Sequence, residues 1–530
     1  MKRRCGALGV VVLISGVATG QTGENAPAFQ VADVHESAKA TNPYMRGGFI
    51  VGGRFEVRSA TMLELIATAY DFEAEKIAGG PAWLNTDRFD ILAGAPATTS
   101  QETAKLMLQS LLAERFKLAV HKDTRPLPVF LLSSGKSKPR AKESDGKTPS
   151  GCQVQPQPNS QPLSGAFTVV ACRNVTMAVF AEALRGMANA YLGNTVIDST
   201  GLIGAWDFDI KWHQRNQIPA AGSEATTIFD AVDKQLGLKL ERQTRPLPVL
   251  VVDGVNRNPT ENAPDVTKKL PPPPPAEFEV ATIKPSAPDS PPMGRVQNGR
   301  VDLQGLTLKN VIQLAWDIDN DQMMAGLPKF AESVRYNIAA KAPSGVAATN
   351  EDEADIDTLR LMLRSLLIER FKLAAHTEDR PVEGYTLTAT KPKLEKADPS
   401  GRTECKDGPG KDGKDPRIAN PVLNRLVTCT NVTMAQFAER LPQFANGYVR
   451  TAVLDSTGIE GAWDVTVSFS GVNLIRNNGA PGQPGTPADP NGALSLPDAV
   501  AKQLGLKLQL QKRMMPVLVI EHLEEKPSEN

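Results

Sequence analysis

One segment of the chain occurs twice, and this duplication constrains the fold more than any other feature. Residues 106–126 read LMLQSLLAERFKLAVHKDTRP, and residues 361–381 read LMLRSLLIERFKLAAHTEDRP. In both copies leucines recur at helical spacing, and apolar residues then alternate with polar ones. This change of period predicts a helix that leads into a strand. We also expect a turn at Arg125-Pro126, across which residues 129–133 pair back as a hairpin.

The similarity between the two copies extends over most of the 530 residues. We therefore predict repeat 1 at residues 28–256 and repeat 2 at residues 277–526. Each repeat is expected to close with a helix and a hairpin, at Asp230 to Val252 and at Asp498 to Ile520. Residues 257–276 form a Pro-rich linker, whose LPPPPP run favours a stiff spacer that holds the repeats apart.

Strand and helix patterns follow one another within each repeat, and together they predict an α+β fold. A chain of this length is too long for one ordinary core. We predict two tandem domains of antiparallel sheets flanked by helices, with two lobes per repeat and the cysteine-containing loop between the lobes. The segment from Gly471 to Asn491 is rich in Gly, Pro and Asn, and we predict that it is disordered.

Residues 1–20 have the pattern of a secretory signal peptide. Three basic residues precede an apolar run from Leu8 to Val17, and small residues follow this run. No other stretch reaches the roughly 18 to 20 apolar residues that a membrane-spanning helix needs. We therefore predict a secreted or periplasmic protein with no membrane span after signal cleavage, and an uncleaved anchor is the alternative.

The charge balance argues against nucleic acid as a partner. The chain has 59 basic and 59 acidic residues, and three of the basic residues belong to the signal. The mature protein is therefore slightly acidic, and it lacks the basic excess that attracts nucleic acid or an acidic membrane surface.

Four cysteines remain after removal of the signal, and each repeat holds two of them: Cys152, Cys172, Cys405 and Cys429. Each pair spans a loop rich in Pro, Gly and Ser in a chain that is expected to be exported. This arrangement predicts two disulfides, Cys152 with Cys172 and Cys405 with Cys429. Their long separations, with no adjacent Cys or His, do not suit a zinc site.

Two kinds of side chain recur at equivalent positions and are candidate functional residues. His121 and His376 stand at strand ends, where they are either a general base or ligand, or are hydrogen-bonded to the following turn. Trp206 and Trp463 are interpreted as core or hairpin aromatics, and an exposed pair would instead form a recognition surface for sugars or peptides.

Aspartates recur as well. Asp198 and Asp455 begin D-S-T-G segments, and Asp207 and Asp464 follow a few residues later. Paired carboxylates would suit acid–base chemistry, but an aspartate in such a segment more commonly bonds its own backbone to fix a turn. The D-S-T-G segment also has one residue more than the D-[ST]-G loop of aspartic proteases.

The chain has no recognisable catalytic motif. The segment GPGKDGK at residues 408–414 has the spacing of a phosphate loop, but Asp415 follows where Ser or Thr would hold magnesium. The motifs G-x-S-x-G and H-E-x-x-H are absent. We therefore assign no catalytic residue, no metal site and no cofactor. The sequons at Asn174 and Asn431 are interpreted as helix starts that Thr176 and Thr433 cap.

Several motifs carry a family resemblance: FEVATIKPS, GGPAWLNTDRFDILA, LLAERFKLAVH, VIDSTGLIGAWDF and DAVxKQLGLKL. At these residues the chain resembles an uncharacterised family of proteins exported by soil bacteria, a domain of unknown function that occurs singly or in tandem. Repeat 2 departs from the pattern at Gly326 to Phe330. The resemblance implies export and domain limits, and no activity. The closing segment of each repeat is also similar to the short amino-terminal domain of secretins and outer-membrane receptors, a small interaction module.

These observations predict a non-enzymatic exported binding or scaffolding protein that contacts a peptide, an envelope component or a polysaccharide. The contacts are expected at sheet edges or in grooves between lobes, with strand addition as the first mode to consider. One alternative is an extracellular hydrolase whose carboxylates are brought together by the fold. The other is the sensor part of an envelope signalling system. The sequence indicates no oligomeric state.

Overall fold

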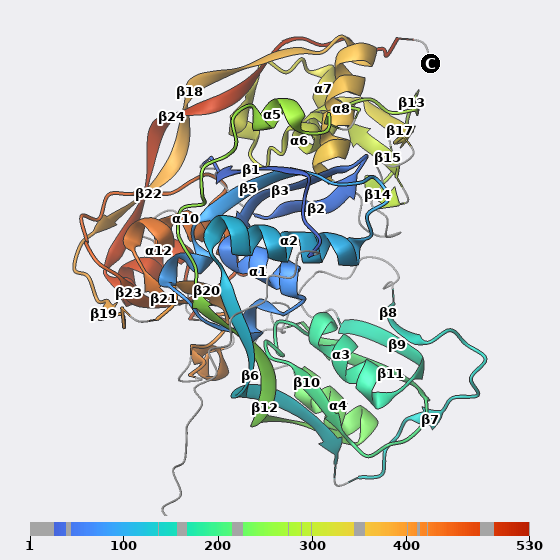
Figure 1. Ribbon diagram of the computed structural model, residues 1–530, viewed down its shortest axis with the longest axis vertical. Coiled ribbons are helices and arrows are strands. Elements are labelled where there is room, and N and C mark those ends of the chain that lie inside the picture. Colours follow the sequence, from blue (N-terminus) through green and yellow to red (C-terminus); the bar gives the residue numbers. More distant parts are fainter. Residues whose placement is uncertain are drawn as a thin grey trace, which may run out of the picture.

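The computed structural model describes residues 26–38, 44–135, 137–155, 167–214, 226–273, 275–287, 289–297, 299–343, 356–399, 401–410, 414–420, 422–476 and 492–528. Each repeat forms two lobes joined by a long two-stranded ribbon (Figure 1). This confirms the α+β class and the tandem arrangement. The predicted signal peptide and residues 477–491 of the predicted disordered segment lie outside the described residues. Residues 472–476 of that segment form the short helix α11 (Val472–Arg476).

The first lobe of repeat 1, here lobe 1A (residues 31–118), is an antiparallel sheet in the order β1-β5-β3-β2 packed against two helices. Its elements are β1 (Val31–Glu36), β2 (Arg46–Val51), β3 (Arg54–Thr61), α1 (Met62–Tyr70), β5 (Arg88–Gly94) and α2 (Gln101–Phe116). Thr61 caps α1 in a capping box with Glu64. Leu108, Leu112 and Phe116 of α2 are buried against the sheet, so the duplicated leucine pattern marks the core face of this helix, except at its first leucine, Leu106, which is exposed.

Lobe 1A continues into ribbon 1, which consists of β6 (Ala119–Ser134) and β12 (Leu238–Gly254). The two strands pair antiparallel along their lengths. At one end β4 (Ile77–Gly79) adds to β12, and at the other end β10 (Val196–Ser199) adds to β6, both in parallel. The hairpin predicted at Arg125-Pro126 is therefore wrong, as are the closing hairpins, because each strand continues through its prolines.

The prolines explain why the centre of ribbon 1 remains two-stranded. Pro126 lies opposite Pro246, and neither residue has an N–H group to donate. This pair therefore occupies a non-hydrogen-bonded position of the ladder, and Pro128 and Pro248, two residues further along their strands, do so too. At such positions N–H groups point away from the partner strand. The four prolines thus remove donors from the open edges, where another strand would otherwise pair.

The second lobe of repeat 1, lobe 1B (residues 135–236), has its own antiparallel sheet in the order β7-β11-β9-β8. Its elements are β7 (Lys142–Glu143), β8 (Gly151–Val154), β9 (Phe167–Val175), α3 (Met177–Met187), β11 (Trp206–His213) and α4 (Ile228–Leu236). The predicted Cys152–Cys172 disulfide is present and joins directly opposed residues of β8 and β9. It lies inside the sheet of lobe 1B, so its expected place between the lobes is wrong.

Repeat 2 has the same plan, with lobe 2A (residues 280–373), ribbon 2 and lobe 2B (residues 390–505). Lobe 2A contains β13 (Val280–Pro285), β14 (Met293–Gln297), β15 (Arg300–Thr307), α6 (Leu308–Trp316), β16 (Met324–Ala325), α7 (Phe330–Ser333), β17 (Arg335–Lys341) and α8 (Ile356–Phe371). Ribbon 2 consists of β18 (Ala374–Ala389) and β24 (Leu506–His522). Lobe 2B contains β19 (Glu395–Lys396), β20 (Glu404–Asp407), α9 (Pro416–Ala419), β21 (Arg425–Val432), α10 (Met434–Phe444), β22 (Leu454–Asp455), β23 (Trp463–Phe469) and α12 (Leu496–Ala499). The Cys405–Cys429 disulfide joins β20 and β21.

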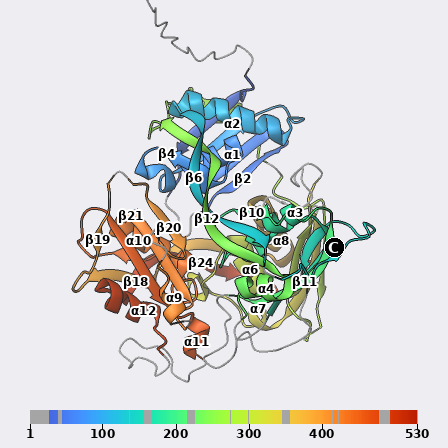
Figure 2. The same ribbon diagram turned by 90° about the horizontal axis from the view of Figure 1, so that it is seen from below.

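The two repeats are in contact, contrary to the expectation of a spacer that holds them apart. Lobe 1A lies between the lobes of repeat 2 (Figures 1 and 2). On one side Arg46 of β2 pairs with Asp357 of α8 at 3.2 Å. On the other side Arg402, just before β20, donates to the carbonyl oxygen of Ile77 at 2.6 Å. The linker also packs on lobe 1A, because its short helix α5 (Val266–Lys269) lies against β1.

Candidate functional site

The two recurring histidines lie on the ribbons, at equivalent positions. His121 Nδ1 is 2.8 Å from a carboxylate oxygen of Asp253, and His376 Nδ1 is 2.9 Å from one of Glu521. In each case the carboxylate belongs to the other strand of the ribbon, so the expected bond to a following turn is replaced by a cross-strand pair. Both histidines are exposed to solvent.

The recurring aspartates bond backbone groups. Asp198 accepts from the N–H of Thr200 at 2.9 Å, and Asp455 accepts from Thr457 in the same way. Asp207 accepts from the N–H of Asn174 at 2.8 Å, and this bond supports the left-handed backbone of Asn174, whose φ is 50°. These contacts have the geometry of turn-fixing side chains.

The two tryptophans are partly buried and pack against the cores of lobes 1B and 2B. Trp463 Nε1 donates to the carbonyl oxygen of Glu460 at 3.2 Å. Trp206 Nε1 is buried without a hydrogen-bond partner among the described residues. The histidines therefore lie on the ribbons while the aspartates and tryptophans belong to the B lobes, so these candidates do not form one shared site.

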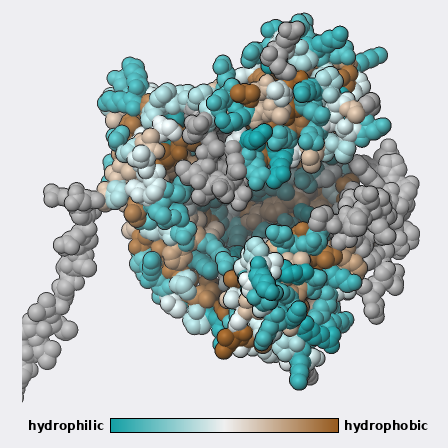
Figure 3. Space-filling model, turned by 90° about the vertical axis from the view of Figure 1, so that its right-hand side faces the viewer, coloured by the Kyte–Doolittle hydropathy of each residue, from teal (hydrophilic) through white to brown (hydrophobic). Residues whose placement is uncertain are grey.

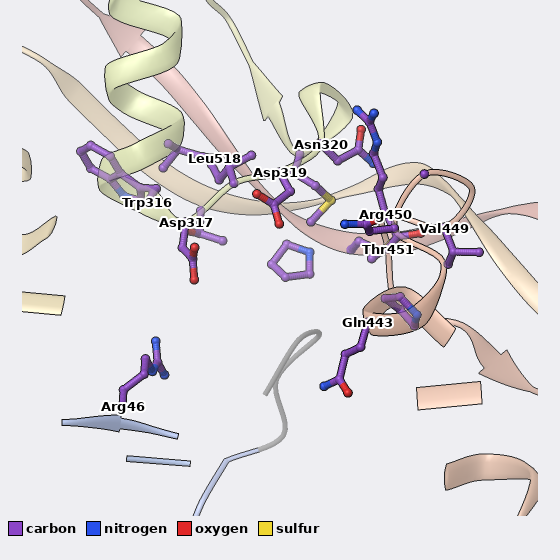
Figure 4. Close-up of a pocket in the computed structure, with 18 residues that line it drawn as sticks. Arg46, Trp316, Asp317, Asp319, Asn320, Gln443, Val449, Arg450, Thr451 and Leu518 are labelled. Carbon is purple, nitrogen blue, oxygen red and sulfur yellow. The ribbon is translucent and has the colours of Figure 1, made fainter. Parts of the chain in front are cut away.

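A cavity of about 870 Å³ lies between the two lobes of repeat 2, and we call it the interlobe cavity. Its lining comes from the segment after α6, from ribbon 2, from the end of α10 with the following loop, and from β2 of lobe 1A. Figure 4 shows Arg46 on one side of the opening, with Arg450 and Val449 on the opposite side. The space-filling view in Figure 3 shows a face of the molecule that is hollowed at its centre, with apolar residues at the bottom of the hollow.

The lining of the interlobe cavity combines an apolar wall with polar groups of both signs. Met515 and Leu518 of β24 are buried side chains of the wall. Asp319 is exposed and makes no hydrogen bond or ion pair with another described residue. Arg450 is exposed as well. The pKa of Asp321 is lowered chiefly by a hydrogen bond from Lys309, and the charge of Arg450 contributes to this lowering. A ligand in this cavity would therefore meet the free carboxylate of Asp319, the guanidinium groups of Arg46 and Arg450, and an apolar surface.

In repeat 1 an ion-pair cluster crosses the corresponding gap, and we call it the clasp. Arg185 of α3 in lobe 1B binds Glu73 at 2.6 Å and also binds Glu75, both in lobe 1A. The two carboxylates lie at the 3-10 turn η1 (Ala74–Lys76), for which Glu73 is the capping residue. The clasp therefore connects the two lobes of repeat 1 directly across the gap.

Repeat 2 lacks all three members of the clasp. Counted from the shared N-V-T-M motif, the position of Arg185 is occupied by Pro442. Counted from the capping residue of the turn η4 (Asp321–Met323), the two glutamates are replaced by Asn320 and Gln322. Both Asn320 and Pro442 line the interlobe cavity. The three positions whose charges bridge this gap in repeat 1 are thus occupied by uncharged residues in repeat 2.

Tyr448 lies beside the cavity lining and predicts a dependence of stability on alkaline pH. Its hydroxyl donates to the carbonyl oxygen of Ser470 at 2.8 Å, and burial raises its pKa to about 12. An unfolded tyrosine ionises near pH 10. The contribution of the neutral Tyr448 hydroxyl to folding stability is therefore complete below about pH 10 and is lost as the pH rises towards 12.

In urea unfolding, we expect the free energy of unfolding of the wild-type protein to fall by on the order of 1 kcal/mol between about pH 10 and 12. This figure allows for the partial exposure of Tyr448. The variant Tyr448→Phe should lack this component, because phenylalanine does not titrate. An equal loss of stability in the variant and in the wild type would contradict the assignment to Tyr448.

The cavity residues carry no motif, and the sequence predictions missed them. The sequence nevertheless indicated one of them. When the two repeats are aligned on the N-V-T-M motif, Arg185 stands opposite Pro442 within otherwise similar helices. Within the described part of the chain no group of three or more His, Cys, Asp or Glu side chains could hold a metal ion. Every helix described is too short or too polar to cross a membrane.

Comparison with protein families gives one result. The model of a family described as a protein of unknown function (DUF3738) matches residues 63–255 and again residues 309–523. Comparison with curated proteins and with solved structures finds no match. The two matched regions lie one in each repeat and together cover most of the chain. The protein therefore belongs to the DUF3738 family of unknown function and contains two tandem copies of its domain.

Proposed function

We propose that this protein is a non-enzymatic binding protein of the extracytoplasmic space and that its interlobe cavity in repeat 2 receives a peptide. The difference between the repeats carries the proposal. The clasp of Arg185, Glu73 and Glu75 crosses the gap in repeat 1, whereas the equivalent gap in repeat 2 contains a cavity of about 870 Å³. That volume lies in the range of ligand sites. The two disulfides are consistent with an oxidising compartment.

The lining favours a peptide over a polysaccharide. Sugar recognition commonly uses an aromatic ring with an open face. Trp316 is the aromatic side chain of the described lining, and the guanidinium of Arg364 lies over its ring at 5.1 Å. The lining instead presents amides, charges of both signs and thioether and aliphatic groups, which match the backbone and side chains of a peptide.

The edges of the two ribbons are poorly suited to the addition of a strand, and the cavity is the better candidate site. In ribbon 1 the prolines at positions 126, 128, 246 and 248 remove outward N–H groups from both edges of its centre. In ribbon 2 the outward N–H of Glu383 donates to the side chain of Gln322. A bound strand would thus find few free donors at these two places.

The test uses the mature chain and a library of short synthetic peptides of random sequence. We expect the wild-type protein to enrich a subset of peptides. Asn446 is exposed in the cavity lining, so the variant Asn446→Trp should fill the opening and weaken binding of the enriched peptides at least about tenfold. The equivalent residue in repeat 1 is Asn189, and the matched variant Asn189→Trp should bind like the wild type.

A second variant in the same assay rebuilds the clasp in repeat 2. The triple variant Asn320→Glu, Gln322→Glu and Pro442→Arg should lower affinity, because an ion pair would cross the cavity. The double variant without the arginine is its control and should keep the cavity open. Equal enrichment by the wild type and by Asn446→Trp, or retention of polysaccharides with no peptide enriched, would contradict the proposal.

A further inference from the structure

A second and smaller cavity adjoins the interlobe cavity. It has a volume of about 210 Å³ and lies where β2 and β3 of lobe 1A face α8 of lobe 2A. Arg46 and Asp317 line both cavities, so the interlobe cavity leads towards this second one. We call the second cavity the arginine pocket, because guanidinium groups dominate its lining.

The arginine pocket has an excess of positive charge. Its guanidinium groups come from both repeats: Arg46, Arg54, Arg58, Arg360 and Arg364. Its carboxylates are fewer: Glu56, Asp317 and Asp357. Cations therefore outnumber anions in the lining, and an anion that entered the pocket would restore the balance.

Each carboxylate of the pocket is shared or already engaged. Glu56 receives the guanidinium of Arg54 at 2.9 Å and also that of Arg58. Asp357 lies 3.2 Å from Arg46 and 3.3 Å from Arg360. The third carboxylate, Asp317, also pairs with Arg360. The carboxylates present therefore cannot satisfy all of the guanidinium N–H groups.

Buried donors in the pocket lack hydrogen-bond partners. The Nε atoms of Arg46 and Arg360 are buried and make no hydrogen bond with any described residue. For Arg46 this holds although Asp357 is within ion-pair distance, because the direction of the N–H does not suit a bond. Buried donors normally have a partner, so the donors of this cationic pocket are not fully satisfied by the described residues. Burial and the neighbouring Arg360 lower the pKa of Arg364, whereas, against the effect of burial, Tyr44, Asp317 and Asp357 raise the pKa of Arg360. The uncompensated positive charge therefore lies at Arg364.

We infer that the arginine pocket binds an oxyanion, and that this oxyanion is a carboxylate of the peptide held in the adjoining interlobe cavity. Guanidinium groups match a carboxylate well, since their paired N–H donors reach both oxygens. The oxyanion site stands on the pocket itself, whereas its assignment to a peptide carboxylate rests on the proposed function. The ligand class is thus an acidic peptide or one with a free carboxyl end next to Arg46.

The first experiment measures thermal unfolding of the mature chain with inorganic sulfate against chloride at equal ionic strength. We expect a saturable stabilisation by sulfate in the wild type, above the non-saturable rise that excluded salts give. Arg58 has 50% of its side chain exposed, so Arg58→Gln should fold normally. It should weaken the apparent sulfate affinity about tenfold, as loss of a charged hydrogen bond does.

Arg364→Gln is the second pocket variant and should have the same effect on sulfate affinity. The matched control is Arg245→Gln, which removes an exposed arginine from ribbon 1 and should respond to sulfate like the wild type. Equal sulfate responses in all four proteins would overturn the oxyanion site.

The second experiment compares peptides enriched by the cavity with the same peptides whose carboxyl groups are amidated. We expect amidation to weaken binding about tenfold in the wild type and to have little effect in Arg58→Gln and Arg364→Gln. Sulfate binding combined with peptides that are insensitive to amidation would overturn the carboxylate assignment and leave the oxyanion site standing. Absence of any enriched peptide would instead count against the proposed function.

Discussion

Replacing Arg115 by methionine should lower the free energy of unfolding of lobe 1A by about 3 kcal/mol, because a buried and fully engaged guanidinium would be lost. Arg115 belongs to the duplicated E-R-F-K-L motif and is only 8% exposed. It donates to Thr260 and Asn262 of the linker, at distances of 2.5 to 2.9 Å, and to the carbonyl oxygen of Ala32 in β1 at 3.2 Å. The side chain thus fastens the segment that leaves ribbon 1 to the sheet of lobe 1A.

Hydrogen exchange of the amides in β1 and α2 measures this effect locally, which suits a chain with several lobes. Glu114 precedes Arg115 on the same helix and is exposed, so Glu114→Met is the matched control and should change stability by less than about 0.5 kcal/mol. Arg370 of α8 is the equivalent residue of repeat 2 and donates to the carbonyl oxygen of Ser528. The variant Arg370→Met should lower the stability of lobe 2A to a similar extent. Unchanged exchange in Arg115→Met would show that the linker is held by other contacts.

Removing the Cys405–Cys429 disulfide by alanine substitution should also cost about 3 kcal/mol, because the bridge restricts the unfolded chain between β20 and β21. In this lobe the loss should spread to the contact with repeat 1. Arg402 lies three residues before Cys405, and its Nη2 donates to the carbonyl oxygen of Ile77 in β4. Increased disorder of β20 would therefore weaken the contact between lobe 1A and lobe 2B.

The measurement compares urea unfolding with hydrogen exchange in β4. The matched variant lacks the Cys152–Cys172 disulfide, which lies in lobe 1B and does not carry Arg402. Both variants should lose similar stability, but only the Cys405–Cys429 variant should exchange faster in β4. Equal exchange in β4 for the two variants would mean that the contact between the repeats is independent of this disulfide.

Local features of the fold were predictable from particular residues. The leucines before Glu114 predicted the helix α2, and Thr176 and Thr433 predicted the starts of α3 and α10, which they cap. The prolines of the ribbons were misread as turns. A proline ends a strand only where its N–H is needed by a neighbour, and at Pro126 no neighbour needs it.

The candidate site was not predictable in the same way. His121, Asp198 and Trp206 were candidate functional residues because they recur. The contacts of Asp198 and Trp206 lie within one lobe, however, and those of His121 lie along one ribbon. Recurrence selects residues that both copies need, and both copies need their cores and turns. The interlobe cavity depends on residues that differ between the copies, such as Arg185 and Pro442.

The sequence by itself determined the duplication, the α+β class and the pairing of the cysteines within each repeat, because these follow from order and short-range periodicity. Only the tertiary structure decided that β6 pairs with β12, that lobe 1A sits between the lobes of repeat 2, and that arginines of both repeats share one pocket. Periodicity indicates which face of each helix or strand is buried, but it carries no information on which distant surfaces meet. Those contacts depend on packing between lobes that are far apart in the chain.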